Sequence, residues 1–84
     1  MNVEFLDELI ELVLKIKSKE EMKEFLFGLL TKTELSEIPT RVQIIKMLRK
    51  GFPHHRIAEK LGVGVATVSR GSKELKKGRF SNIE

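Results

Sequence analysis

Two helix-start patterns, a proline and a glycine turn divide this chain into segments that favour helices throughout. Ser18-Lys19-Glu20-Glu21 and Thr31-Lys32-Thr33-Glu34 each place a glutamate three positions after a hydroxyl residue, the capping-box pattern that begins a helix. Pro53 suits the first turn of a later helix, and Gly62-Val63-Gly64 suits a tight turn. Between these marks apolar residues recur at three- and four-residue spacing. The sequence therefore predicts an all-α chain of five helices.

The predicted helices cover residues 3–17, 19 to about 30, 32 to about 50, 53–61 and 65 to about 76. Pro39 falls inside the third of these and removes the amide that would bond to the Leu35 carbonyl, which predicts a kink or a helix that stops and restarts. Gly51 suits the left-handed position that ends this helix. Residues 77–84 lack helical periodicity.

The size of the chain bears on its assembly. With 84 residues and no Cys, we expect a single domain with a small core and no disulfide to stabilise it. The first helix is apolar over much more than one stripe, so it needs several packing partners. We therefore expect oligomerisation. Residues 1–4 do not resemble a signal peptide and no apolar run approaches membrane-spanning length, so a cytoplasmic location and no membrane contact are expected.

Charge is distributed unevenly between the two halves of the chain. Residues 1–40 hold five basic and nine acidic residues, a net charge of −4, whereas residues 41–84 hold eleven basic and three acidic residues, a net charge of +8. A basic half favours a polyanionic partner. The alternatives are an ordinary solvated surface, or a helical interaction module whose basic face binds an acidic protein.

Residues 53–76 have the features of a helix-turn-helix. Ala58 permits close approach of two helices, Gly62 can adopt a positive φ in the turn, and Val68 can close the core between them. The second helix would then present small apolar, hydroxyl and basic groups to DNA from its N-terminal half: Val65, Ala66, Thr67, Ser69, Arg70 and Lys73. This pattern predicts double-stranded DNA as the partner.

At these positions the chain resembles a known family. The run Ala66-Thr67-Val68-Ser69-Arg70-Gly71-Ser72, with Thr40-Arg41 and Leu30-Thr31 at matching spacing, is similar to the Trp repressor family, including its YerC/YecD-like members. The resemblance implies an intertwined all-helical homodimer that reads a palindromic operator. In that arrangement residues 1–50 would form the dimerisation core, residues 51–76 the DNA-reading head and residues 77–84 a basic tail, and the family's C-terminal helix is missing after Phe80.

The resemblance also implies residue roles. Arg41 and Arg70 match the two arginines that sandwich the indole of an L-tryptophan co-repressor, with Thr31, Gly71 and Glu74 at neighbouring ligand positions. Glu74 replaces a serine; it could pair with the ligand's ammonium, or it could bind Arg70 and close the site. The segment from Gly51 to Gly62 has YerC/YecD-like length, while Gly71 agrees better with the tryptophan-responsive repressors, so a ligand-independent regulator stays the alternative. The DNA-contacting positions would be His55, Val65, Ala66, Thr67, Ser69, Arg70, Lys73 and, in the basic C-terminal segment, Lys76.

Catalysis and metal binding find little support in the sequence. His54 and His55 are adjacent, so on a helix they point about 100° apart, and no Cys completes a metal site. Arg41 with Glu37 and Arg70 with Glu74 are spaced as ordinary helix ion pairs, which is the plainer interpretation of both arginines. The sequence therefore predicts a DNA-binding transcriptional regulator of the repressor type, with no enzymatic activity, no metal and no prosthetic group.

Overall fold

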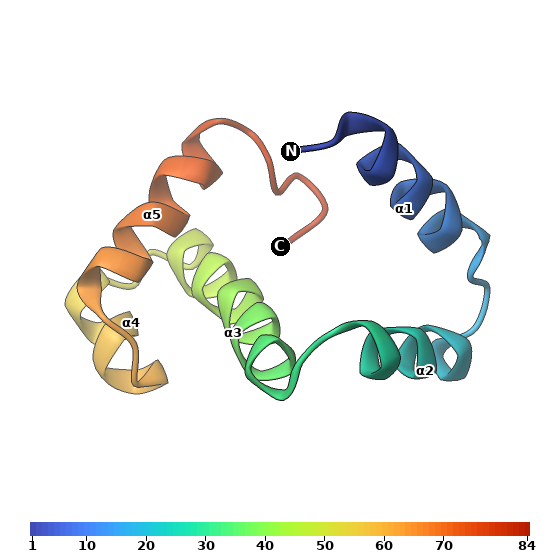
Figure 1. Cartoon of the computed structure of the whole chain (residues 1–84). Helices are drawn as coiled ribbons and strands as arrows, with labels where there is room; N and C mark the ends of the chain where they lie inside the picture. The colour runs from blue at the N-terminus through green and yellow to red at the C-terminus, as the bar shows by residue number, and fades with distance from the viewer. The chain divides into compact units, whose positions relative to one another are not determined.

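The computed structural model describes all 84 residues, and every regular element in it is a helix (Figure 1). The helices are α1 (Val3–Lys15), α2 (Lys19–Leu29), α3 (Lys32–Arg49), α4 (His54–Leu61) and α5 (Val65–Lys76). The predicted all-α class and number of helices are confirmed. The chain divides into two compact units, Met1–Leu35 and Ser36–Glu84. The predicted functional division at residue 50 stays a prediction.

Local capping begins the helices of the first unit. The Asn2 side chain accepts a hydrogen bond from the Phe5 amide at 3.0 Å, and the Ser18 hydroxyl accepts one from the Glu21 amide at 3.0 Å. The second predicted capping box is reciprocal, because the Thr31 hydroxyl accepts from the Glu34 amide at 3.1 Å and the Glu34 carboxylate accepts from the Thr31 amide at 2.9 Å. That backbone amide lowers the pKa of Glu34. The Thr31–Glu34 box is therefore confirmed, and at the start of α2 the Ser18 cap is confirmed while the Glu21 carboxylate accepts from the Lys17 amide at 3.4 Å.

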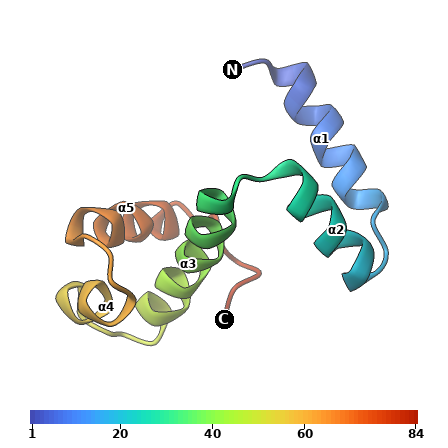
Figure 2. The same ribbon diagram turned by 60° about the horizontal axis from the view of Figure 1, so that its bottom comes forward.

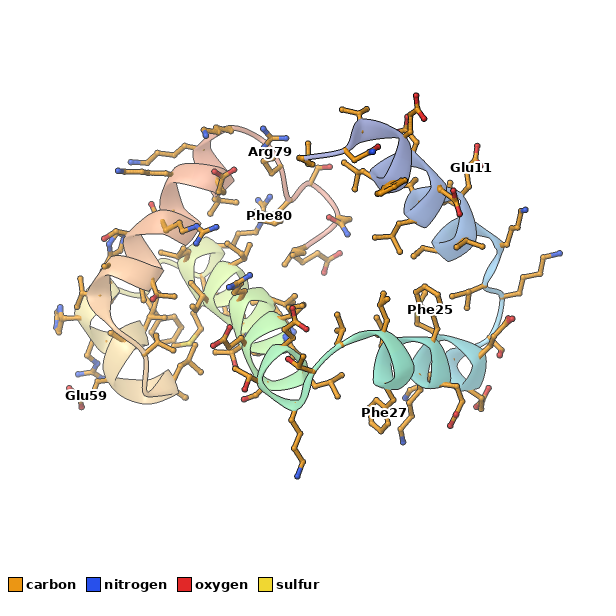
Figure 3. All side chains as sticks on the ribbon, viewed as in Figure 1. Glu11, Phe25, Phe27, Glu59, Arg79 and Phe80 are labelled. Atoms are coloured by element: carbon orange, nitrogen blue, oxygen red, sulfur yellow. The ribbon has the colours of Figure 1, made fainter.

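The first unit leaves its apolar side chains uncovered. No residue of α1 or α2 is buried. Phe5 is 71% exposed and Leu14 is 76% exposed in α1, and Phe27 of α2 is 58% exposed with the Lys23 ammonium 5.6 Å from its ring centre (Figure 3). Helices that are apolar on more than one side require further partners.

α3 is continuous through Pro39, so of the two predicted outcomes the stop and restart does not occur, and the kink stays a prediction. Proline removes one backbone hydrogen bond, to the Leu35 carbonyl, near the start of the helix. The later turns are held by packing, because Ile44 and Ile45 are buried. Gly51 has a φ of 87° and follows the end of α3, as predicted.

In the second unit α4 and α5 pack together beside α3, as both ribbon views show (Figures 1 and 2). The core of this unit contains Ile44, Ile57, Ala58 and Val68, with Met47, Leu48, Leu61 and Val63 packed against it. α4 begins at His54, one residue later than predicted, and Pro53 is its N-cap residue rather than part of its first turn. The first helix likewise ends at Lys15 rather than near residue 17, because Ile16 is extended. None of the five helices combines the length and apolar character needed to cross a membrane.

Candidate DNA-binding head and ligand pocket

The turn between α4 and α5 has the geometry that a helix-turn-helix requires. Gly62 ends α4 with a φ of 67°, a left-handed conformation that other residues adopt at a cost. The Val63 amide then donates to the Ala58 carbonyl at 3.0 Å, which fixes the turn. Val68 is 0% exposed and Ala58 is 7% exposed, so the two helices meet over small, fully packed side chains.

α5 presents most of its predicted DNA-contacting residues to solvent. Val65 is 50% exposed, and the exposed set continues with Ala66, Thr67, Arg70, Lys73 and Lys76. Gly64, the N-cap residue of α5, provides no side-chain cap, so the first amides of the helix have no side-chain partner. Free amides at a helix N-terminus favour an anion such as a phosphate. His55 on α4 is also exposed.

Ser69 differs from the other predicted contacts. It is only partly exposed, and its hydroxyl lies 3.5 Å from His54 Nδ1 across the α4–α5 contact. The hydroxyl therefore links two helices of the head. Sequence reasoning missed this pair because the two residues are fifteen positions apart and neither spacing nor composition joins them.

A cavity of about 410 Å³ lies between α3, α5 and the segment that follows α5. Four of the five predicted ligand residues line it: Arg41, Arg70, Gly71 and Glu74. Its other lining residues are largely apolar: Ile38, Val42, Ile44, Ile45, Thr67, Phe80 and Ile83. An apolar chamber with two guanidinium groups suits a small apolar anion.

Two basic residues of the cavity differ in their pairing. Arg41 Nη2 lies 3.8 Å from Glu37 Oε2, and both side chains are more than half exposed. The ordinary helix pair considered from the sequence is therefore present, although it is long and weak. Arg70 has no ion-pair partner within 4.0 Å, so the predicted helix pair with Glu74 does not form.

Glu74 does not pair with Arg70, the partner within this chain that the sequence suggested. Its Oε1 lies 3.2 Å from Lys77 Nζ and its Oε2 lies 3.3 Å from Arg79 Nε. The hydrogen bond and charge of Lys77, followed by the charges of Arg79 and Arg70, hold the pKa of Glu74 below its usual value. The carboxylate is therefore ionised and engaged by residues after α5. An Arg70–Glu74 ion pair that would close the site is not present in the structure.

Gly71 has a packing role that the sequence did not reveal. A Cβ at this position would lie 3.2 Å from Ile44 Cγ2 and 3.4 Å from Ile45 Cδ1. The missing side chain thus allows α5 to approach α3 closely beneath the cavity. Room beside a ligand, the role implied by resemblance, is a separate effect of the same absent side chain.

Thr31 is the one predicted ligand residue outside the cavity lining. It belongs to the first unit, where its hydroxyl caps α3. That bond explains Thr31 by helix capping, and its ligand role stays a prediction.

Phe80 and Ile83 are lining residues that sequence reasoning missed. Both lie in the non-helical segment 77–84, which we name the tail. Phe80 is an isolated aromatic residue in a polar stretch, and that is the one signal that could have pointed to it. A second cavity, of about 420 Å³, lies between α3 and the turn; Arg41 and Thr67 line both cavities. No group of three or more His, Asp or Glu side chains is arranged to hold a metal ion.

Comparison with known proteins gives a consistent result. Residues 4–81 match the family model described as Trp repressor protein. The chain is 35% identical over 65 residues to an uncharacterised protein named YerC from Bacillus subtilis, covering 77% of this chain and 62% of that protein. It is 36% identical over 70 residues to a Trp operon repressor homolog from Vibrio campbellii, covering 82% of this chain and 70% of the relative.

A shorter match is more similar. Over 49 residues the chain is 51% identical to a Trp operon repressor homolog from Photobacterium profundum, covering 57% of this chain and 48% of the relative. The chain thus spans between about half and 70% of the length of these relatives. No solved structure gives a significant match.

Proposed function

The chain belongs to the Trp repressor family, whose members are regulators rather than enzymes, and from this premise we propose that it is a sequence-specific DNA-binding transcriptional repressor. The observation that carries the proposal is the exposed outer face of α5, where Val65, Ala66 and Lys73 follow a left-handed glycine turn. A recognition helix needs such a face to reach base edges in the major groove. The net charge of +8 over residues 41–84 adds attraction for phosphates.

The repressor acts as a homodimer in the cytoplasm. Support comes from the uncovered apolar side chains of α1 and α2, such as Phe5, Leu14 and Phe27, which a second copy would bury. A two-fold dimer presents two recognition helices about 34 Å apart and so binds a palindromic operator. Sedimentation equilibrium checks this step; a monomer at micromolar concentration would contradict it.

An effector binds in the cavity that Arg41 and Arg70 line, and L-tryptophan is the ligand implied by the family. Two guanidinium groups and apolar walls support an aromatic carboxylate there. The YerC-like alternative is a regulator that needs no ligand, and the similarity to YerC keeps it as the second candidate.

Selection from a random palindromic DNA pool, read by fluorescence anisotropy at fixed salt, tests these proposals together. Enrichment only with L-tryptophan indicates a co-repressor, which acts through its higher affinity for the DNA-competent state. Enrichment with and without it indicates the ligand-independent regulator. No enrichment above salt-sensitive background would reject sequence-specific DNA binding and favour a module that binds an acidic protein.

Variants separate base contacts from phosphate contacts. Thr67→Ala and Ser69→Ala are expected to change sequence preference, whereas Lys76→Ala weakens binding to all DNA and lowers the salt slope by about one phosphate contact. Lys19→Ala, in α2, is the matched control because it removes the same charge outside the head. Equal effects of Lys19→Ala and Lys76→Ala would show that total charge alone drives binding.

A further inference from the structure

The tail, residues 77–84, forms one side of the cavity between α3 and α5. Phe80 and Ile83 line the cavity, and both are partly buried although the tail has no regular structure. The Ile83 amide donates to the Phe80 carbonyl at 3.0 Å, which turns the tail back on itself. Figure 3 labels Arg79 and Phe80 on this segment. The cavity wall thus includes a piece of chain outside the helices.

Three side-chain contacts attach the tail to the helices, besides the backbone hydrogen bonds that end α5. Arg49 Nη2 donates to the Phe80 carbonyl at 2.7 Å, which joins the tail to the end of α3. Lys77 and Arg79 both pair with Glu74 of α5, at 3.2 and 3.3 Å. The acceptors of these three side-chain contacts are the Phe80 carbonyl and the Glu74 carboxylate, and Glu74 itself lines the cavity.

Glu74 is the only acidic residue that lines this cavity. Its Oε1 contacts Lys77 and its Oε2 contacts Arg79, so each carboxylate oxygen has one basic residue of the tail as its partner. A ligand ammonium that approaches Glu74 therefore meets a carboxylate already paired with Lys77 and Arg79 and is repelled by both cations, whereas a ligand carboxylate meets the guanidinium groups of Arg41 and Arg70. The two classes of ligand therefore differ in their effect on the contacts that Lys77 and Arg79 make with Glu74.

We propose that the tail determines the specificity of this cavity: Lys77 and Arg79 compete with a ligand ammonium for Glu74, so the cavity prefers an apolar carboxylate without an amino group over a zwitterionic amino acid. The inference rests on the proposed effector pocket and deepens it. An amino acid still binds, and its ammonium then weakens the contacts of Lys77 and Arg79 with Glu74.

The packing of the tail against the cavity can be tested without any ligand. The chain has no Trp and no Tyr, so Phe80→Trp introduces a single indole reporter. We expect the tryptophan fluorescence of this variant to be blue-shifted, because the indole is partly buried in the cavity wall. Adding Arg79→Ala should shift the fluorescence to the red, because the tail loses a contact with α5. Arg56→Ala removes the same charge from α4 and is expected to leave the emission unchanged. Ile83→Trp is a second reporter if the larger ring does not fit at position 80. Emission equal to that in urea for both reporters would overturn the proposal.

Ligand preference is tested by calorimetry with L-tryptophan and indole-3-propionate, which share indole and carboxylate and differ in the ammonium. Arg79→Ala is expected to raise the affinity for L-tryptophan relative to indole-3-propionate by up to about five-fold, the range of one exposed ion pair. Arg56→Ala is expected to leave the ratio unchanged. An unchanged ratio in Arg79→Ala would refute competition for Glu74. Binding of neither probe to any variant would refute it as well, while operator selection without ligand would still test the DNA-binding function separately.

Discussion

The close approach of α5 to α3 at Gly71 gives a test in which two opposing effects are separated by a matched variant. Gly71→Ala adds one methyl group that would lie 3.2 Å from Ile44 Cγ2 and 3.4 Å from Ile45 Cδ1. Gly28→Ala adds the same group in α2, where nothing lies within 4 Å. Neither glycine has a positive φ, so neither substitution strains the backbone.

The magnitudes follow from these distances. Alanine in place of glycine inside a helix stabilises by up to about 1 kcal/mol, and both variants share this gain. Overpacking against a buried side chain costs about 1 to 3 kcal/mol, and only Gly71→Ala incurs it because Ile44 and Ile45 are buried. We expect Gly28→Ala to be neutral or stabilising and Gly71→Ala to lie about 1 to 3 kcal/mol below it in free energy of unfolding.

Urea unfolding followed by helical circular dichroism measures this difference. Both variants and the unaltered chain must be compared at one protein concentration, because association would add to the apparent stability. If Gly71→Ala is as stable as Gly28→Ala, the close approach of the two helices is refuted. A loss of L-tryptophan binding with no loss of stability would assign Gly71 to the ligand rather than to helix packing.

Three further outcomes are expected. Thr31→Ala removes the hydroxyl that caps α3 and should cost about 0.5 to 2 kcal/mol of unfolding free energy in the same urea assay; no cost would leave the ligand role as the reason for threonine. Ile57→Val, at a fully buried position, should cost about 0.5 to 1.5 kcal/mol, whereas Val65→Ala on the exposed face should cost less, and the reverse order would contradict the assigned core. Because the pKa of Glu74 is lowered in the folded chain, its stabilising contribution is complete above the unfolded value and is lost as pH falls through the folded value. The emission of Phe80→Trp should therefore shift to the red in that acidic range, and a shift already complete near pH 7 would contradict the Glu74 contacts.

The helix boundaries could be predicted from the sequence because they depend on contacts within a few residues. The Thr31–Glu34 capping box, the Ser18 cap and the left-handed glycines after α3 and α4 are of this kind, and each occurs where it was expected. Pro39 was harder, because its effect depends on how the rest of α3 packs. The continuous helix reflects the burial of Ile44 and Ile45 further along, which spacing alone does not reveal.

The cavity was predicted in part. Arg41, Arg70, Gly71 and Glu74 were brought together by resemblance, and the structure places all four in one lining. The partners of Glu74 and the role of Phe80 were not predicted. They depend on the course of a tail without periodicity, and the Arg49–Phe80 contact joins residues 31 positions apart. No local pattern encodes a contact over that separation.

The twelve residues of α5 lie in three different environments: the core, the cavity and the solvent. Val68 is enclosed by the core, Arg70 and Glu74 border the cavity, and Val65 lies on the solvent face. The core and the cavity restrict the inward side chains of the helix, and the proposed DNA contact restricts the exposed ones. Substitutions should therefore be tolerated least along α5 and more freely at exposed positions of α4 such as Glu59 and Lys60. A change of DNA or ligand specificity would then have to come from the few substitutions in α5 that preserve folding.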